Sequence, residues 1–325
     1  MNKLKKIGLS ALAGSLAFSA VQAGELAVSG GAEVTYTHLD GSEVTGTPWG
    51  MGRLITFSGS GDLDNGMTMG FFSSMNDSMS GISSSAMSIG MGSMGTVAYE
   101  TGANGSGINS ADNMVPTAFE EADHGVDTGA VQVGDDHGSS GVLSYNNTIA
   151  GIKFSSQYNP RSGTGAINDS GTGGDTGKGS AWSMVLSSSD FVDGLTVGYA
   201  IGEIDKTTNG VGQDSDTMWA NYASGPVTVG FQVGNVEETG QTEHNNRILG
   251  ISFAVNDSLA LSYQILEDEY EKIGANNVTS TFTGISASYT MGSLAIKGTM
   301  NDVDDMGGTT GGSDQNTELS ISVAF

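Results

Sequence analysis

The sequence contains no cysteine, only four prolines and few charged residues. Without cysteine, the chain has no disulfide, no thiol chemistry and no cysteine-ligated metal site. Charged residues make up 14% of the 325 residues and apolar ones 37%, both below the levels of a typical soluble domain. Basic residues are the scarcest, because 11 Lys and Arg oppose 36 Asp and Glu, for a net charge of −25. Binding to phosphates requires a basic surface, so nucleic acid is excluded as a partner.

Long apolar runs are also missing after the first residues. Residues 1–23 combine a basic start, an uncharged apolar stretch and the small-residue cleavage site Val21-Gln22-Ala23, a pattern typical of a secretory signal peptide. We therefore predict export, with residues 24–325 forming the mature domain. No later apolar run reaches the ~20 residues of a membrane-spanning helix, so transmembrane helices are not expected.

The mature chain instead alternates between apolar and polar side chains. Near the end, apolar residues such as Leu319 and Ile321 are separated by small polar ones such as Ser320 and Ser322. A period of two indicates β-strands with one apolar face. The same pattern recurs at residues 26–36, 152–158, 195–202, 227–234, 249–255 and 259–265. Because the second face is small and polar, it suits a water-filled interior and does not suit a packed core.

The connections between these segments alternate in length. Seven short turns separate eight longer Gly-, Asp- and Asn-rich loops, which predicts sixteen strands. This arrangement is typical of an outer-membrane barrel. We therefore predict an all-β fold, a 16-stranded antiparallel transmembrane β-barrel with short periplasmic turns and long extracellular loops. The phase stays open in residues 76–92, which have few apolar residues, and in the tenth strand, where Met218 and Tyr222 compete with Trp219 for the outward face.

Four features together resemble the trimeric general diffusion porins of Gram-negative outer membranes, particularly the alphaproteobacterial type. These are the signal peptide, the opening segment 24–30, the Phe57-Ser58-Gly59 strand leading into the turn at 64–68, and the alternating end at Phe325. The resemblance implies a 16-stranded barrel, a homotrimer and a third loop folded into the pore. It also implies that the barrel-assembly machinery reads Phe325, and that lipid and lipopolysaccharide surround the protein.

Residues 102–140 form the longest connection and, by count, the third long loop. No Lys or Arg occurs between Arg53 and Lys153, so this loop is purely acidic. It lies either outside, as a solvated acidic surface, or in the lumen as the constriction, which its length and position favour. Pro116 suits the first turn of a short helix there. The acidic residues expected at the constriction are Asp112, Glu120, Glu121, Asp123 and Asp127.

The facing wall has few basic residues. The alternation places Glu33, Glu100, Lys153 and Lys297 on the lumen face. Arg53 and Arg247 have outward parity, at the rim or the subunit interface, unless a glycine such as Gly52 shifts the register. General porins usually oppose the acidic loop with a basic cluster, and this chain has only weak counter-charges. We therefore expect a net negative pore that admits small hydrophilic solutes and ions and prefers cations.

Other chemistry has weaker support. No cofactor is required, but Ca²⁺ would suit the oxygen-rich set Asp112, Glu120, Glu121 and Asp123 if the loop folds inside. A solvated acidic rim is the alternative for the outer loops. The loop histidines would allow a hydrolase on the rim, yet no nucleophile elbow or HExxH motif accompanies them, so enzymatic function is not expected. A secreted calcium-binding adhesin would need tandem repeats that the sequence lacks. A solute-specific porin remains the main alternative.

Overall fold

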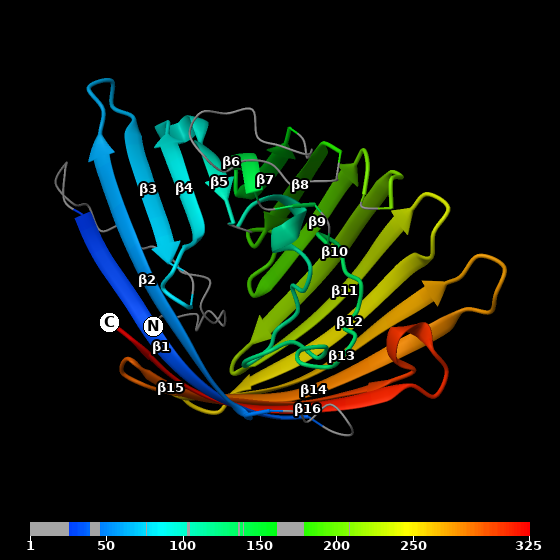
Figure 1. The fold of residues 1–325 in the computed structure, drawn as a ribbon. Helices are drawn as coiled ribbons and strands as arrows, with labels where there is room; N and C mark the ends of the chain where they lie inside the picture. Colours follow the sequence, from blue (N-terminus) through cyan, green and yellow to red (C-terminus); the bar gives the residue numbers. More distant parts are fainter. Residues whose placement is uncertain are drawn as a thin grey trace.

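The computed structural model describes residues 26–39, 46–75, 77–102, 105–135, 137–138, 140–160, 179–207 and 209–325. The predicted signal peptide, residues 1–23, lies outside these ranges. The described residues form sixteen antiparallel strands, each paired with its neighbours in the sequence, and the sheet closes into a barrel (Figure 1). The predicted fold class and strand number are therefore confirmed.

The strands have the following bounds: β1 (Leu26–Leu39), β2 (Trp49–Asp62), β3 (Thr68–Met75), β4 (Ile82–Gly90), β5 (Thr96–Thr101), β6 (Ser140–Ile149), β7 (Ile152–Asn159), β8 (Ala181–Ser188), β9 (Leu195–Ile204), β10 (Gln213–Ser224), β11 (Val227–Glu238), β12 (Glu243–Ala254), β13 (Leu259–Glu271), β14 (Val278–Met291), β15 (Leu294–Asp304) and β16 (Ser313–Ala324). Three short 3₁₀ turns accompany them: η2 (Gly92–Met94), η3 (Gly107–Ser110) and η4 (Met306–Gly308). In the part of the chain that the structure describes, no helix is long and apolar enough to cross a membrane.

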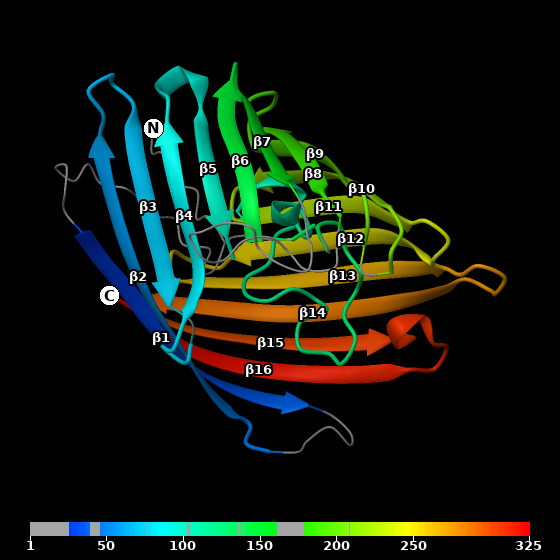
Figure 2. The same ribbon diagram turned by 45° about the horizontal axis from the view of Figure 1, so that its top comes forward.

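Pairing of the first and last strands closes the barrel. Strand β1 is hydrogen-bonded to both β2 and β16, so no strand edge is left open (Figure 2). The backbone N–H and carbonyl of Phe325 exchange hydrogen bonds of 2.9 and 2.8 Å with Gly30. An unpaired edge strand would leave backbone N–H and carbonyl groups without hydrogen-bond partners. Closure of the barrel removes this cost, so the sheet is stable when lipid surrounds it.

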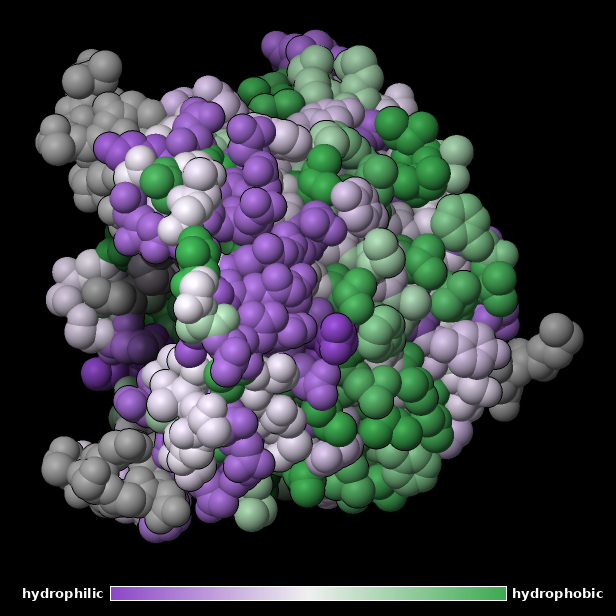
Figure 3. Space-filling view, turned by 90° about the vertical axis from the view of Figure 1, so that its right-hand side faces the viewer, coloured by the Kyte–Doolittle hydropathy of each residue, from purple (hydrophilic) through white to green (hydrophobic). Residues whose placement is uncertain are grey.

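The outer face is apolar and the inner face is mostly small and polar. On β12, Leu249, Ile251 and Phe253 point outward and are exposed, whereas Ser252 on the other face is buried. Hydrophobic residues gather on the outer surface beside a hydrophilic region (Figure 3). Aromatic side chains are frequent on this outer face: Tyr99, Tyr158, Tyr199, Tyr222, Tyr263 and Tyr289 are all more than 40% exposed.

The structure resolves both stretches whose phase the sequence left open. In β4, Met87 and Ile89 are exposed on the outer face, so the few apolar residues of that stretch do set its phase. In β10, Met218 and Tyr222 are outward and about half exposed. Trp219 points inward and is 4% exposed, because it packs against Ile108 and Val133 of the long connection between β5 and β6.

Several strands are longer than the apolar alternation indicates. Residues 236–245 read as a loop in the sequence, but β11 extends to Glu238 and β12 begins at Glu243, which leaves only 239–242 as the connection. The register stays regular through the polar pairs, from Asn235 opposite Asn245 to Val236 opposite His244. Backbone pairing therefore continues past the apolar band, where both faces of a strand are polar and the period of two is no longer visible.

Candidate functional site

The longest connection, residues 102–139 between β5 and β6, crosses the interior of the barrel and is called the inner loop below (Figure 1). Its backbone is bonded to inward-facing side chains of the wall from β7 to β16. A loop that enters a barrel must find partners for its backbone N–H and carbonyl groups. The small polar inner faces of the strands supply those partners.

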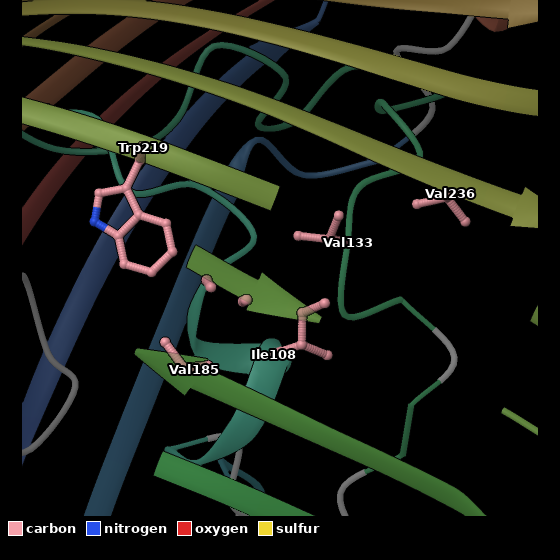
Figure 4. Packing of buried hydrophobic residues seen from close by; sticks show 7 residues of the cluster. Ile108, Val133, Val185, Trp219 and Val236 are labelled. Atoms are coloured by element: carbon pink, nitrogen blue, oxygen red, sulfur yellow. The ribbon is translucent and has the colours of Figure 1, made fainter. Parts of the chain in front are cut away.

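The first contact forms where η3 touches β7 and β8. The N–H groups of Gly107 and Ile108 donate to the hydroxyls of Ser155 and Ser183, at 3.1 and 3.0 Å. Beside these bonds lies a buried apolar cluster that joins the inner loop to the wall, and it includes Trp219 (Figure 4). Its buried members are Ile108, Ala111, Val133, Val185, Ala200, Trp219 and Val236. The inward Trp219 thus packs against the inner loop and away from lipid.

Two buried glutamines of the wall bind the middle of the inner loop. Gln232 on β11 accepts from Met114 N–H at 2.6 Å, and its amide donates to the carbonyls of Ala111 and Asp112, both at 2.8 Å. Gln264 on β13 accepts from Ala122 N–H at 2.7 Å. A buried side-chain amide offers both donors and an acceptor, so one residue satisfies several backbone groups of an irregular segment.

The tip of the inner loop is not helical, contrary to the short helix expected from Pro116. Residues 116–121 form no helix, and the N–H groups of Ala118 and Phe119 donate instead to Ser262 and Ser286 of the wall at 2.8 and 3.0 Å. The wall also leaves room for this close approach. A Cβ on Gly284 would lie 2.9 Å from the Cα atom of Ala122.

The returning part of the inner loop follows β15 and β16. The carbonyl of His124 accepts from the side-chain amides of Asn301 and Asn316, at 2.7 and 3.2 Å. Further on, the N–H of Asp127 donates to Asp314 at 2.7 Å, and that of Val131 donates to Asp268 at 3.0 Å. Asp268 is fully buried and also contacts the ring of His244, which removes it from the water-filled space.

The acidic residues of the inner loop differ in their exposure. Asp112 and Asp127 are exposed, while Glu120, Glu121 and Asp123 are half-buried. Burial, followed by the negative charges of Asp112 and Asp123, raises the pKa of Glu121 to about 8. Burial also raises the pKa of Asp123, although its carboxylate accepts from Ala130 N–H at 3.1 Å. Their mutual influence shows that these carboxylates lie near one another, as crowding inside the barrel requires.

The four wall residues predicted on the lumen face do face inward, in different surroundings. Glu33 accepts a hydrogen bond from Ser320, and Glu100 is buried behind the start of the inner loop, where Ser106 and Ser144 donate to it. Lys153 is exposed and lines a cavity of about 480 Å³ that Trp219 also borders.

Lys297 is 8% exposed, and its ammonium lies 4.8 Å from the centroid of the Phe119 ring, a cation–π contact. It is therefore beside the tip of the inner loop, closer to the acidic residues than its place early in β15 suggests.

The two arginines that the structure describes, Arg53 and Arg247, lie on the outer face, as their parity predicts. Arg53 is exposed on the side of β2 that carries the outward Met51. The guanidinium of Arg247, 62% exposed, lies 3.9 Å from Glu267 and 4.0 Å from Glu269, distances that indicate loose surface pairs. Neither arginine opposes the acidic residues of the inner loop.

The acidic set expected to bind Ca²⁺ does not converge on one point. Of Asp112, Glu120, Glu121 and Asp123, only Glu120 belongs to a group of ligand atoms close enough to share an ion, among the residues that the structure describes. The other members of that group are His124 and Glu318. Calcium binding by the original set remains a prediction.

Sequence reasoning missed Glu318, Gln232 and Gln264 as site residues. A signal for each was present, because each lies on the small polar face of an alternating strand. That parity places the residues inside, but it does not show that a loop more than a hundred residues away bonds to them.

Comparisons with known proteins agree with this architecture. A family model described as Gram-negative porin matches residues 8–325. Among solved structures, a porin refined at 1.8 Å resolution is similar with a TM-score of 0.66 and 15% identity, over 93% of this chain and 100% of its own. The anion-selective porin from Comamonas acidovorans is similar with a TM-score of 0.63 and 17% identity, over 93% of this chain and 99% of its own. The trimer form of OmpT from Vibrio cholerae is similar with a TM-score of 0.68 and 10% identity, over 93% of this chain and 100% of its own. No curated protein is detectably similar in sequence.

Proposed function

Because this chain belongs to the Gram-negative porin family and is an outer-membrane channel protein, we propose that it conducts small hydrophilic solutes and ions passively, with a preference for cations. The observation that carries this proposal is the inner loop inside the barrel, which is rich in Asp and Glu and has no Lys or Arg. On the described strands, Lys153 and Lys297 are the only Lys or Arg residues that face inward. Carboxylates around a narrow aqueous passage attract cations and repel anions.

The sign of the selectivity has to come from these residues, since the fold does not determine it. The similar porin from Comamonas acidovorans is anion-selective. Among the described residues both arginines, Arg53 and Arg247, are on the outer face, and Lys297 is covered by Phe119. Among the described residues, the exposed Asp112 and Asp127 and the half-buried Asp123 form no ion pair with Lys or Arg, and Glu120 is paired only with His124, which favours cations.

The purified protein in a planar bilayer tests this proposal. Under a KCl gradient, the reversal potential should have the sign of a cation-preferring channel. Changing Glu120→Gln, Glu121→Gln and Asp123→Asn together should move that potential toward zero. A matched control makes the same number of amide substitutions outside the lumen, with Glu237→Gln, Asp257→Asn and Glu267→Gln, and should leave it unchanged. Anion preference of the wild-type protein would contradict the acidic filter. Conductance that saturates with one solute would favour the solute-specific alternative.

We also propose that the protein is a homotrimer in the membrane. The trimer form of the similar Vibrio cholerae protein supports this assembly, and the exposed apolar outer face offers the surface for it. A gel of heated and unheated samples tests it, because an unheated trimer migrates near three times the mass of the unfolded chain. Migration of the unheated sample as a single barrel would contradict it.

A further inference from the structure

Three side chains with metal-binding atoms meet where the inner loop passes β16. The Nε2 atom of His124 lies 3.1 Å from a carboxylate oxygen of Glu318, and its Nδ1 atom lies 3.5 Å from one of Glu120. One donor atom from each residue can be chosen so that all three lie within 4.8 Å of one another. All three are half-buried, so the group is sheltered and still reachable from the lumen.

The backbone around this group is held in place from both sides. The carbonyl of His124 accepts from Asn301 and Asn316, and Asp127 N–H is bonded to Asp314 on the same strand as Glu318. Asn316 is 1% exposed, and its Oδ1 atom has no hydrogen-bond partner among the described residues. An unpaired buried amide oxygen beside His124 indicates that the polar groups of this corner are not fully satisfied by protein alone.

We propose that Glu120, His124 and Glu318 bind one divalent transition-metal ion of the zinc type, which ties the inner loop to β16. Zinc takes imidazole nitrogen and carboxylate oxygen at about 2.0–2.2 Å, which places neighbouring ligands of a tetrahedral site about 3.4 Å apart. With Nε2 as the imidazole ligand, the Glu318 oxygen is already at 3.1 Å. Glu120 lies on the Nδ1 side of the ring, so its carboxylate has to rotate toward Nε2 from within 4.8 Å to close the site. The imidazole supplies one nitrogen only, and water completes the coordination.

The histidine determines which ion the site selects. Imidazole nitrogen suits zinc, copper and nickel, whereas calcium and magnesium prefer sites built from oxygen alone. This site therefore differs in residues and in chemistry from the all-carboxylate calcium set predicted from the sequence. Negative charge around the group also favours a cation, because the carboxylates of Asp123 and Glu33 act on it. Lys297 is the basic residue nearby that opposes them.

The expected consequence rests on the proposed channel function. An ion held between the inner loop and β16 adds positive charge to the acidic side of the passage and restrains the inner loop. Both effects should lower cation conductance. Because binding itself does not require conductance, the two proposals can fail separately.

Titration calorimetry of the full-length protein with ZnCl₂ tests the site directly. We expect one ion per chain, with affinity reduced at least tenfold by His124→Gln and also by Glu318→Gln. His38→Gln removes an exposed histidine elsewhere and should leave the affinity unchanged, and MgCl₂ should give no comparable binding. Heat-modifiable gel mobility and β-sheet circular dichroism identify any variant that fails to fold, in which case the isosteric Glu120→Gln replaces it. Equal zinc affinity in the wild-type protein and all folded variants would overturn the proposal.

Conductance in a planar bilayer supplies the second readout. Zinc should lower the conductance of the wild-type channel, and EDTA should restore it, while His124→Gln should be insensitive. Zinc binding without any channel activity would refute the proposed function and leave the metal site standing. A conducting channel that binds no zinc would refute the metal site alone.

Discussion

The close approach of the inner loop to β14 makes Gly284→Ala a severe test of the structure. A Cβ at this position would lie 2.9 Å from both the Cα of Ala122 and the side-chain oxygen of Asn301. The first of these is backbone, so it cannot rotate away. Overpacking of this kind costs about 1–3 kcal/mol. At about 1.4 kcal/mol per factor of ten, the population with the inner loop in place should fall roughly 5- to 150-fold relative to a displaced state.

Single-channel recording measures this displacement. Gly284→Ala should give larger or fluctuating conductance and weaker cation preference, because the acidic side chains leave the passage. Gly250→Ala should act alike, since its Cβ would lie 2.9 Å from the carbonyl oxygen of Pro116. Gly298→Ala is the matched control, because its nearest neighbour would be at 3.4 Å, an ordinary contact. If Gly284→Ala and Gly298→Ala behave alike in conductance, selectivity and thermal unfolding, the inner loop does not pack as the structure shows.

Three further predictions follow from the same site. Glu121, with its pKa raised to about 8, is mostly protonated at pH 6 and ionised at pH 9, so cation preference measured by reversal potential should increase over that range. Glu121→Gln should reduce the increase without removing it, because the hydrogen bond to Glu318 also raises the pKa of His124, which loses its positive charge as the pH rises. Gln264→Leu leaves the buried N–H of Ala122 without its acceptor, so unfolding monitored by circular dichroism should show a loss of about 1–3 kcal/mol; an unchanged midpoint would be inconsistent with that bond. Lys297→Met keeps the apolar stem and removes the charge beside Phe119, so cation preference should increase, whereas Lys206→Met at the rim should have no effect.

The barrel was predictable from the sequence because alternation is a local property. Each strand records its two faces in neighbouring residues, as in Leu249 to Phe253, and short turns separate it from the next. Strand order then follows the chain, and closure requires only that β1 meet β16. Prediction failed locally where the pattern disappears, at the polar strand ends near residues 236–245, because backbone pairing there needs no apolar face.

By itself, then, the sequence determined an acidic, sixteen-stranded barrel and, outside β4 and β10, which side chains of the alternating strands face inward. Only the tertiary structure decided where the inner loop rests, that Gln264 and Ser262 hold its backbone, and that His124 meets Glu318. The physical reason is distance along the chain. These contacts join residues more than a hundred positions apart, and they form only after barrel closure has fixed the inner wall in space.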